Sequence, residues 1–204
     1  MNNKQLNFDN SLYVSNYSLN LYNISKEKNI DIIDNFFSDD IVIYIKSFFN
    51  NNFWINNCIK YSNIDSFGGD EPFFRLDLNE ETFFTKKLKT IIERKLDKKF
   101  NLNRVYAVSQ FYEQDSNYHI DSICKKSFTF CYYINTSVVD EETKGYLFIK
   151  IPEKHFLLAI EPFSNRGILF PSHYIHKGTG INNGLRICIA WKFTISNFVP
   201  LKQY

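Results

Sequence analysis

Two histidines, one aspartate and one arginine have the types and the spacing that could build a metal centre. His119 and Asp121 are separated by one residue, His176 follows 55 residues after Asp121, and Arg186 follows ten residues after His176. On an extended segment the first pair would point to one face, because side chains alternate along a strand. A second histidine from a distant strand would complete a set of two imidazoles and one carboxylate. That set leaves three positions open on an octahedral metal and is typical of non-haem Fe(II) centres.

Another histidine could take the place of His176 as the second imidazole ligand. His173 lies three residues before His176, so on a strand the two side chains would face opposite ways. The ten-residue spacing to Arg186 favours His176, and His155 is interpreted as a surface residue. Taken singly, each of these residues has an ordinary interpretation, since a His-x-Asp pair arises by chance and a lone histidine is more often part of a core or surface.

Composition narrows the class of protein. The chain has 204 residues, of which 44% are hydrophobic, and this is enough for one sizeable core. The net charge of +2 does not favour a nucleic-acid partner. The four cysteines form no C-x-x-C pair, which suggests free thiols in a reducing compartment. Since there is no apolar leader and no run approaching 18 apolar residues, we expect a cytoplasmic protein without a membrane span.

Two helices are predicted in the first half of the chain. One runs from Ser38, a good N-cap, to about Phe49, with acidic residues in its first turn and an apolar stripe of Ile41, Ile45 and Phe48. The other runs over 80–98 after a cap at Asn79. Its apolar residues recur at helical spacing and form one continuous stripe, made of Phe84, Leu88, Ile91, Ile92 and Leu96.

The second half of the chain reads as short strands rich in aromatic or β-branched residues, separated by turn residues. The predicted strands are 104–113, 118–122, 127–135, 145–151, 155–161, 167–171, 173–177 and 185–194. So many short strands favour an antiparallel double-sheet barrel of the jelly-roll or cupin type. The expected fold class is therefore mainly β with flanking helices (α+β), in which the N-terminal helices pack on one sheet.

The order of these features resembles the Fe(II)- and 2-oxoglutarate-dependent dioxygenases, especially their prolyl-hydroxylase-like branch. The resemblance covers 104–193 well, 38–98 more loosely, and the first 30 residues not at all. It rests on four stretches, which are Gln110-Phe111-Tyr112 with His119-Ile120-Asp121, the run 129–135, the run 145–148, and His176 with Gly184-Leu185-Arg186 and Trp191-Lys192-Phe193. Members of the family usually have two adjacent glycines where this chain has Lys144-Gly145.

The resemblance implies one dioxygenase domain over 1–204. Residues 1–103 would supply N-terminal strands and supporting helices, and residues 104–195 would form a double-stranded β-helix with iron at its mouth. Carried over by position, the iron ligands and catalytic residues would be His119, Asp121 and His176.

The resemblance also implies a cosubstrate site. Arg186 would pair with the distal carboxylate of 2-oxoglutarate, and a planar guanidinium suits that task because it can bind a carboxylate in bidentate fashion. Thr129 and Tyr133 match hydroxyls that share this carboxylate, and the alternative interpretation is that they are ordinary inward-facing barrel residues. Tyr112 would contact the other end of the cosubstrate.

The implied reaction uses Fe(II), O2 and 2-oxoglutarate, which is decarboxylated to succinate while an unactivated C–H bond is hydroxylated. The substrate would be an amino acid or a peptidyl, proline-like residue, and charged loops at 66–75 and 113–117 would meet it. Alternatives are a non-catalytic cupin-like binding or regulatory barrel and a small-metabolite oxygenase of the same superfamily. No nucleic-acid or membrane partner is expected, and the sequence leaves the oligomeric state open.

Overall fold

A computed structural model describes residues 29–50, 59–61, 73–112, 114–134, 144–152 and 157–196. His155 and Cys58 lie outside these ranges, as does most of the predicted 66–75 loop. Among the described residues, no helix is both long and apolar enough to cross a membrane.

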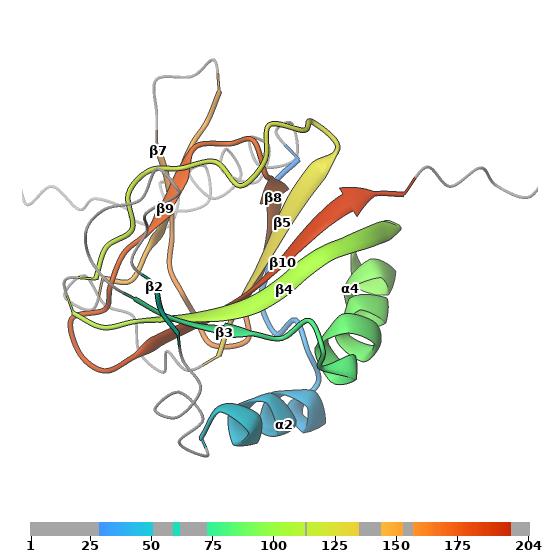
Figure 1. Cartoon of the computed structure of the whole chain (residues 1–204), viewed down its shortest axis with the longest axis horizontal. Helices are drawn as coiled ribbons and strands as arrows, with labels where there is room; N and C mark the ends of the chain where they lie inside the picture. Colours follow the sequence, from blue (N-terminus) through green and yellow to red (C-terminus); the bar gives the residue numbers. More distant parts are fainter. Residues whose placement is uncertain are drawn as a thin grey trace, which may run out of the picture.

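The described strands form two antiparallel sheets (Figure 1). The larger sheet has the spatial order β1 (Asp31–Ile33), β8 (Gly167–Pro171), β5 (Ser127–Tyr133), β10 (Arg186–Ile195), β4 (Phe100–Gln110), β3 (Phe73–Asp77) and β2 (Ile59–Tyr61). The smaller sheet has the order β7 (Leu157–Ile160), β6 (Leu147–Lys150) and β9 (His176–Gly178). β1 lies beside β8, and β10 lies between β5 and β4, so the larger sheet brings together residues from both halves of the chain.

The strand β10 divides the protein into two layers, because its side chains alternate between the faces of the larger sheet. One face carries the apolar residues Ile187, Ile189, Trp191 and Phe193, which belong to the core shared with the helices. The other face carries Cys188 and Ala190, which pack in a second cluster with Leu147, Ile149 and Leu158 of the smaller sheet. The interior of the protein between the two sheets is therefore lined on one side by the inward-facing residues of β10 and its neighbouring strands.

The helices cover the outer face of the larger sheet. They are α2 (Asp39–Asn50), the π-helix η1 (Phe83–Leu88) and α4 (Lys89–Leu96), and Figure 1 shows α2 and α4 on the opposite side of β4 and β10 from β7 and β9. Phe84 and Trp191 join the two layers, because their ring centroids are 6.5 Å apart and the Trp191 indole donates a 3.0 Å hydrogen bond to the Phe84 carbonyl. Ile41, Ile45, Leu88, Ile92 and Leu96 are buried as the apolar stripes predicted, whereas Phe49 replaces Phe48 as the buried residue at the end of α2.

The second helix begins later than the sequence predicted. It starts at Phe83 after an N-cap at Thr82, and its first turns are π-helical. Asn79 is not the cap, because its side-chain oxygen accepts a 2.8 Å hydrogen bond from the backbone N–H of Val105 in β4. The bond from Trp191 occupies a carbonyl that an α-helix would use for its own ladder, which gives a physical reason for the wider turn.

Two predicted strands are also corrected. The segment 118–122 is irregular except for one antiparallel bridge between His119 and His176. The predicted strand 173–177 begins only at His176, because the chain turns after β8, where the backbone N–H of Tyr174 donates to the carbonyl of Pro171. The prediction that His173 and His176 share a strand is therefore wrong.

Candidate metal centre

The structure brings His119, Asp121 and His176 together. Each offers one ligand atom, and these atoms all lie within 4.8 Å of one another. The backbone sets this geometry, since His119 and His176 exchange two backbone hydrogen bonds of 2.9 Å, and the backbone N–H of Asp121 donates to the carbonyl of Ser172. Among the described residues no other group of three or more His, Cys, Asp or Glu side chains could hold a metal ion.

Both imidazoles are oriented for ligation through the same nitrogen. Nδ1 of His119 lies 2.8 Å from the carbonyl oxygen of Asn117, and Nδ1 of His176 lies 2.9 Å from that of Tyr174. A carbonyl can only accept, so each Nδ1 donates, and each Nε2 is the nitrogen turned toward the cluster. These Nε2 atoms face the carboxylate of Asp121 at 3.8 Å and 3.3 Å. Such an outer contact is what metal-binding histidines use to fix their tautomer.

The electrostatics keep the ligands in their metal-binding protonation states. Burial lowers the pKa of His119, and the neighbouring His176 lowers it further. Burial alone would raise the pKa of Asp121, but the Lys192 ammonium and His176 outweigh it and hold that pKa well below its usual range. Asp121 is therefore a carboxylate at neutral pH, and His119 is neutral, as metal binding requires. These three residues and their donor atoms fit a divalent metal.

Arg186 lies at the other end of the same interior and is 3% exposed. Its Nε donates to the carbonyl of Gly145 at 2.9 Å, one Nη donates to the Tyr133 hydroxyl at 3.0 Å, and the other donates to the side-chain oxygen of Gln110. All three partners are neutral, and they use three of the five guanidinium N–H groups. A Cβ on Gly178 would lie 3.1 Å from both terminal guanidinium nitrogens, so a larger residue there would displace the guanidinium by a few tenths of an ångström.

Thr129 lies at the metal end of the interior. Its hydroxyl donates a 2.6 Å hydrogen bond to Oδ2 of Asp121 and lies 3.0 Å from the Ser172 hydroxyl. The structure therefore separates the two hydroxyls that the resemblance placed together, with Tyr133 on Arg186 and Thr129 on Asp121.

Two other predicted residues lie nearer the surface. Tyr112 is 56% exposed, and its contact with the cosubstrate remains a prediction. Arg75 lies in β3 and not in a loop, and its guanidinium carbon is 4.2 Å from the ring centroid of Tyr106.

Lys144 and Gly145 form the turn that contacts Arg186. The backbone of this turn explains how Lys144 can stand where family members usually have the first of two adjacent glycines. Both residues have positive φ, at 59° for Lys144 and 82° for Gly145, in the left-handed region that glycine favours. Lys144 thus adopts the conformation that a first glycine would adopt, and the carbonyl of Gly145 still reaches Arg186.

The sequence reasoning assigned no role to Gln110 or Lys192. Lys192 is buried and its Nζ contacts Oδ2 of Asp121. It could have been found, because it lies six residues after Arg186 and an even offset on a strand keeps the same face. Gln110 is opposite Arg186 in the β4–β10 register, which only the tertiary structure supplies.

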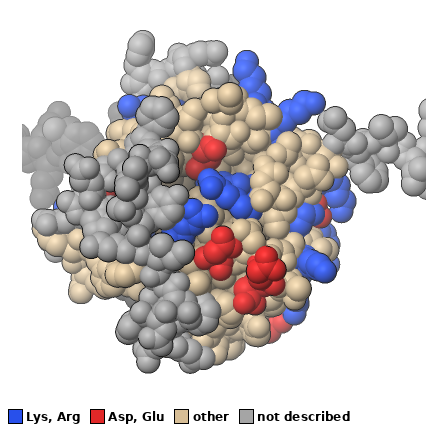
Figure 2. All heavy atoms as spheres, in the orientation of Figure 1, with Lys and Arg blue, Asp and Glu red and all other residues tan. Residues whose placement is uncertain are grey.

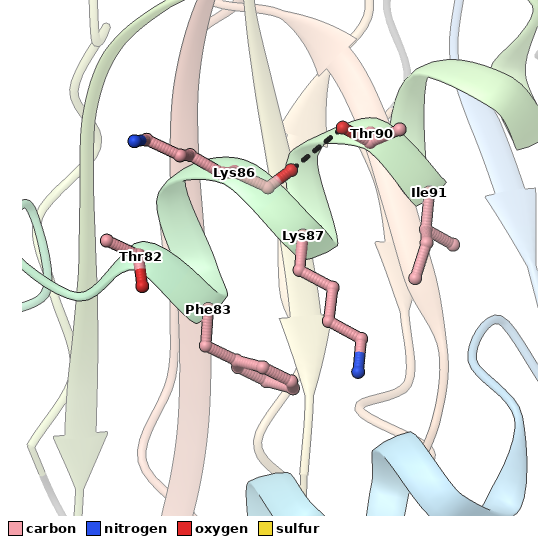
Figure 3. Close-up of a pocket in the computed structure, with 6 residues that line it drawn as sticks. All are labelled: Thr82, Phe83, Lys86, Lys87, Thr90 and Ile91. Atoms are coloured by element: carbon pink, nitrogen blue, oxygen red, sulfur yellow. Dashed lines mark hydrogen bonds between the residues drawn. The ribbon is translucent and has the colours of Figure 1, made fainter.

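The hollow drawn in Figure 3 is a different feature. It has a volume of about 690 Å³ and is lined by Thr82, Phe83, Lys86, Lys87, Thr90 and Ile91. All six come from the segment of η1 and α4, and Figure 3 shows Phe83 and Lys87 pointing the same way from its surface. The hollow thus lies on the helical layer and includes none of the candidate metal ligands.

The charged surface is mixed. On the face that Figure 2 shows, blue Lys and Arg side chains meet red Asp and Glu side chains near the centre, and neither sign covers the face.

Comparison with known proteins supports the fold. No family model and no curated protein matches the sequence. Among solved structures, the chain is similar to a Trichoplax adhaerens prolyl hydroxylase in complex with a hypoxia inducible factor peptide fragment, with a TM-score of 0.68, 14% identity, and coverage of 93% of this chain and 94% of that one.

Two further structures have the same fold. A Pseudomonas putida prolyl-4-hydroxylase has a TM-score of 0.61 and 12% identity, covering 88% of this chain and 99% of that one. The non-haem α-ketoglutarate-dependent epimerase SnoN from nogalamycin biosynthesis has a TM-score of 0.62 and 9% identity, covering 87% and 82%. The chain therefore has the jelly-roll fold of the 2-oxoglutarate–Fe(II) oxygenases, as the sequence predicted.

Proposed function

We propose that this protein is an Fe(II)- and 2-oxoglutarate-dependent dioxygenase that hydroxylates an unactivated C–H bond. The proposed iron ligands are His119, Asp121 and His176, and the proposed cosubstrate anchors are Arg186 and Tyr133. The fold is one that such oxygenases use, but the proposal rests on the site, because a fold alone does not determine a function.

The observation that carries the proposal is the buried Arg186 with only neutral partners. Taking a charge out of water is costly unless an opposite charge or a full set of hydrogen bonds compensates it. Within the described residues, Arg186 contacts no carboxylate, and two of its N–H groups are unused. Its setting therefore favours an anionic ligand inside the barrel, in the same interior as the three proposed metal ligands.

The space between the two ends suits a short dicarboxylate. Thr129 marks the metal end and Tyr133 the arginine end of β5, and four residues of strand span about 13 Å. The inward residues between them on β5 and β10 have small side chains, namely Cys131, Ala190 and Cys188. A five-carbon dicarboxylate such as 2-oxoglutarate could lie over these residues, with one carboxylate on Arg186 and its other end at the metal.

Iron bound here with 2-oxoglutarate and O2 would supply the oxidising chemistry, with decarboxylation to succinate. The chain's own residues hold the two histidine Nε2 atoms and the Asp121 carboxylate in place, orient the cosubstrate through Arg186, and exclude water with the buried walls of the barrel. The burial raises the pKa of Tyr133 above its usual value, despite Arg186, so this hydroxyl stays protonated and can donate to a carboxylate.

The proposed substrate class is supported by a structurally similar protein. One structurally similar prolyl hydroxylase is bound to a peptide fragment, which supports an amino acid or a peptidyl, proline-like residue as the substrate. The exposed Tyr112 is proposed to contact the cosubstrate's other end when the site is filled. Free Cys124, Cys131 and Cys188 support a reducing, cytoplasmic location.

The test is succinate formation from 2-oxoglutarate by protein loaded with Fe(II) under air, with and without a peptide or metabolite extract. We expect iron-dependent succinate production that rises when a substrate is present. The matched control is Asp121→Ala, which keeps the barrel but lacks the carboxylate ligand. Iron and 2-oxoglutarate binding without any succinate would instead support a non-catalytic binding barrel.

A further inference from the structure

Lys192 is a charged residue inside the candidate metal centre that the proposed reaction has not yet used. It lies on the inward face of β10 and is 8% exposed. Its Nζ contacts Oδ2 of Asp121 and lies 3.3 Å from the hydroxyl oxygen of Thr129 and 5.6 Å from the ring centroid of Tyr106. A lysine is seldom buried without a partner, so this ammonium is part of the polar structure of the site.

The backbone aims Lys192 at this place. In the β4–β10 pairing Lys192 is opposite Arg104 and Phe193 is opposite Leu102, so β4 has one extra residue, Asn103. Such a bulge bends its own strand locally, and bulges are common beside active sites. On the other side of β10, the register places Lys192 directly opposite Thr129. Both hydrogen-bond donors to Oδ2 of Asp121 therefore come from one cross-strand pair.

The two oxygens of Asp121 have different partners. Oδ2 accepts hydrogen bonds from the Thr129 hydroxyl, at 2.6 Å, and from the Lys192 ammonium, and it also lies 3.3 Å from Nε2 of His176. Oδ1 lies 3.8 Å from Nε2 of His119 and accepts no hydrogen bond from the described residues. One oxygen is thus occupied by the protein, while the other is left for a ligand.

We propose that Lys192 is a positioning residue which, with Thr129, holds Oδ2 of Asp121 so that the metal can bind only Oδ1. The inference rests on the proposed function, since it concerns the same site. A carboxylate bound through one oxygen leaves about three of six positions open on the metal, whereas binding through both oxygens would leave about two. Lys192 would thereby keep a third position open on a metal bound here.

The first test uses Mn(II) alone as the probe. The full-length protein and the variant Lys192→Met, which keeps the length of the side chain without its charge, are crystallised with Mn(II). We expect Asp121 to bind Mn(II) through Oδ1 in the wild type, with Lys192 and Thr129 still on Oδ2, and through both oxygens in the variant. Lys150→Met is the matched control, because Lys150 contacts the ring of Tyr118 at 4.1 Å and has no described contact with Asp121.

The second test counts metal-bound water by proton relaxation of the Mn(II) protein in solution. We expect about three waters for the wild type and for Lys150→Met, and about two for Lys192→Met. A wild-type structure with Mn(II) on Oδ2 or with Lys192 released from Asp121 would overturn the inference, even where Lys192→Met does not fold.

A Lys192→Met protein that keeps one-oxygen binding and three waters would also overturn it. These outcomes leave the proposed function intact. Failure of the wild type to bind Mn(II) at all would instead remove both the positioning role and the proposed metal centre.

Discussion

The two faces of the larger sheet differ in the side chains that β10 presents to them, which are apolar on one face and partly charged on the other. On the outer face of β10, the apolar residues from Ile187 to Phe193 pack against α2, η1 and α4. On the inner face, the same strand presents Arg186 and Lys192, both nearly as buried as their apolar neighbours. The outer face stabilises the fold by burying apolar area, whereas the inner face holds charges that need specific partners. Stability and function should therefore be separable by alternate substitutions along one strand.

The largest expected effect is at the proposed metal ligands, which lie near Lys192 of the inner face. Alanine at His119, Asp121 or His176 should abolish iron binding and turnover. The loss should exceed about 100-fold in metal affinity, because removal of even an outer-shell partner costs 10–100-fold. His173→Ala is the matched control and should keep activity, since His173 lies outside the cluster. Iron titration and succinate assays would measure both, and iron loss in His173→Ala but not His176→Ala would contradict the assignment.

Substitutions on the outer face of β10 should lower the free energy of unfolding. Trp191→Ala removes a fully buried indole and its hydrogen bond to Phe84, so it should lower the free energy of unfolding by about 3–5 kcal/mol. Denaturant titration measures this loss. Ile195→Ala, at the 36% exposed end of the same strand, is the control and should change stability by less than about 1 kcal/mol. Equal losses from the two variants would mean that the burial of Trp191 does not stabilise the fold.

Arg186→Ala should affect the cosubstrate more than the fold. Loss of the charged partner of a desolvated carboxylate should weaken 2-oxoglutarate binding by about 2–5 kcal/mol. Calorimetry with 2-oxoglutarate on Mn(II)-loaded protein would measure it. The control is Arg104→Ala, whose side chain is exposed on β4. Unchanged 2-oxoglutarate affinity in Arg186→Ala would remove that residue from the cosubstrate site.

The smallest effect is expected at a charge pair outside the metal centre. Arg166 donates two hydrogen bonds to the carboxylate of Asp34, and this contact lowers the pKa of Asp34. Because the folded pKa is the lower one, the stabilisation is present above the unfolded value of about 3.9 and is lost as pH falls through the folded pKa. The Asp34 side chain is 57% exposed, so Asp34→Asn should cost less than about 1 kcal/mol at pH 7.

The difference between wild type and Asp34→Asn should shrink as the pH falls below about 4 and vanish once the carboxyl is protonated in both states. Denaturant titrations at several pH values would measure it. A cost at neutral pH as large as that of Trp191→Ala would mean that this exposed pair is as important as the core.

Local patterns in the sequence were enough to predict antiparallel sheets and to single out three side chains that the structure brings together. Aromatic and β-branched residues on 127–135 and 185–194 indicated the central strands, and order and spacing singled out His119, Asp121 and His176. These features depend on periodicity and on order along the chain, which can be read from the sequence directly.

Contacts between distant segments were decided by the tertiary structure. Asn79 looked like a helix cap but binds β4, because a buried N–H of Val105 competes for the same side chain. Thr129 was assigned to the cosubstrate carboxylate but contacts Asp121, since the irregular segment after His119 folds back over β5. Lys192 contacts Asp121 from the register position opposite Thr129, and that register results from the packing of the whole sheet.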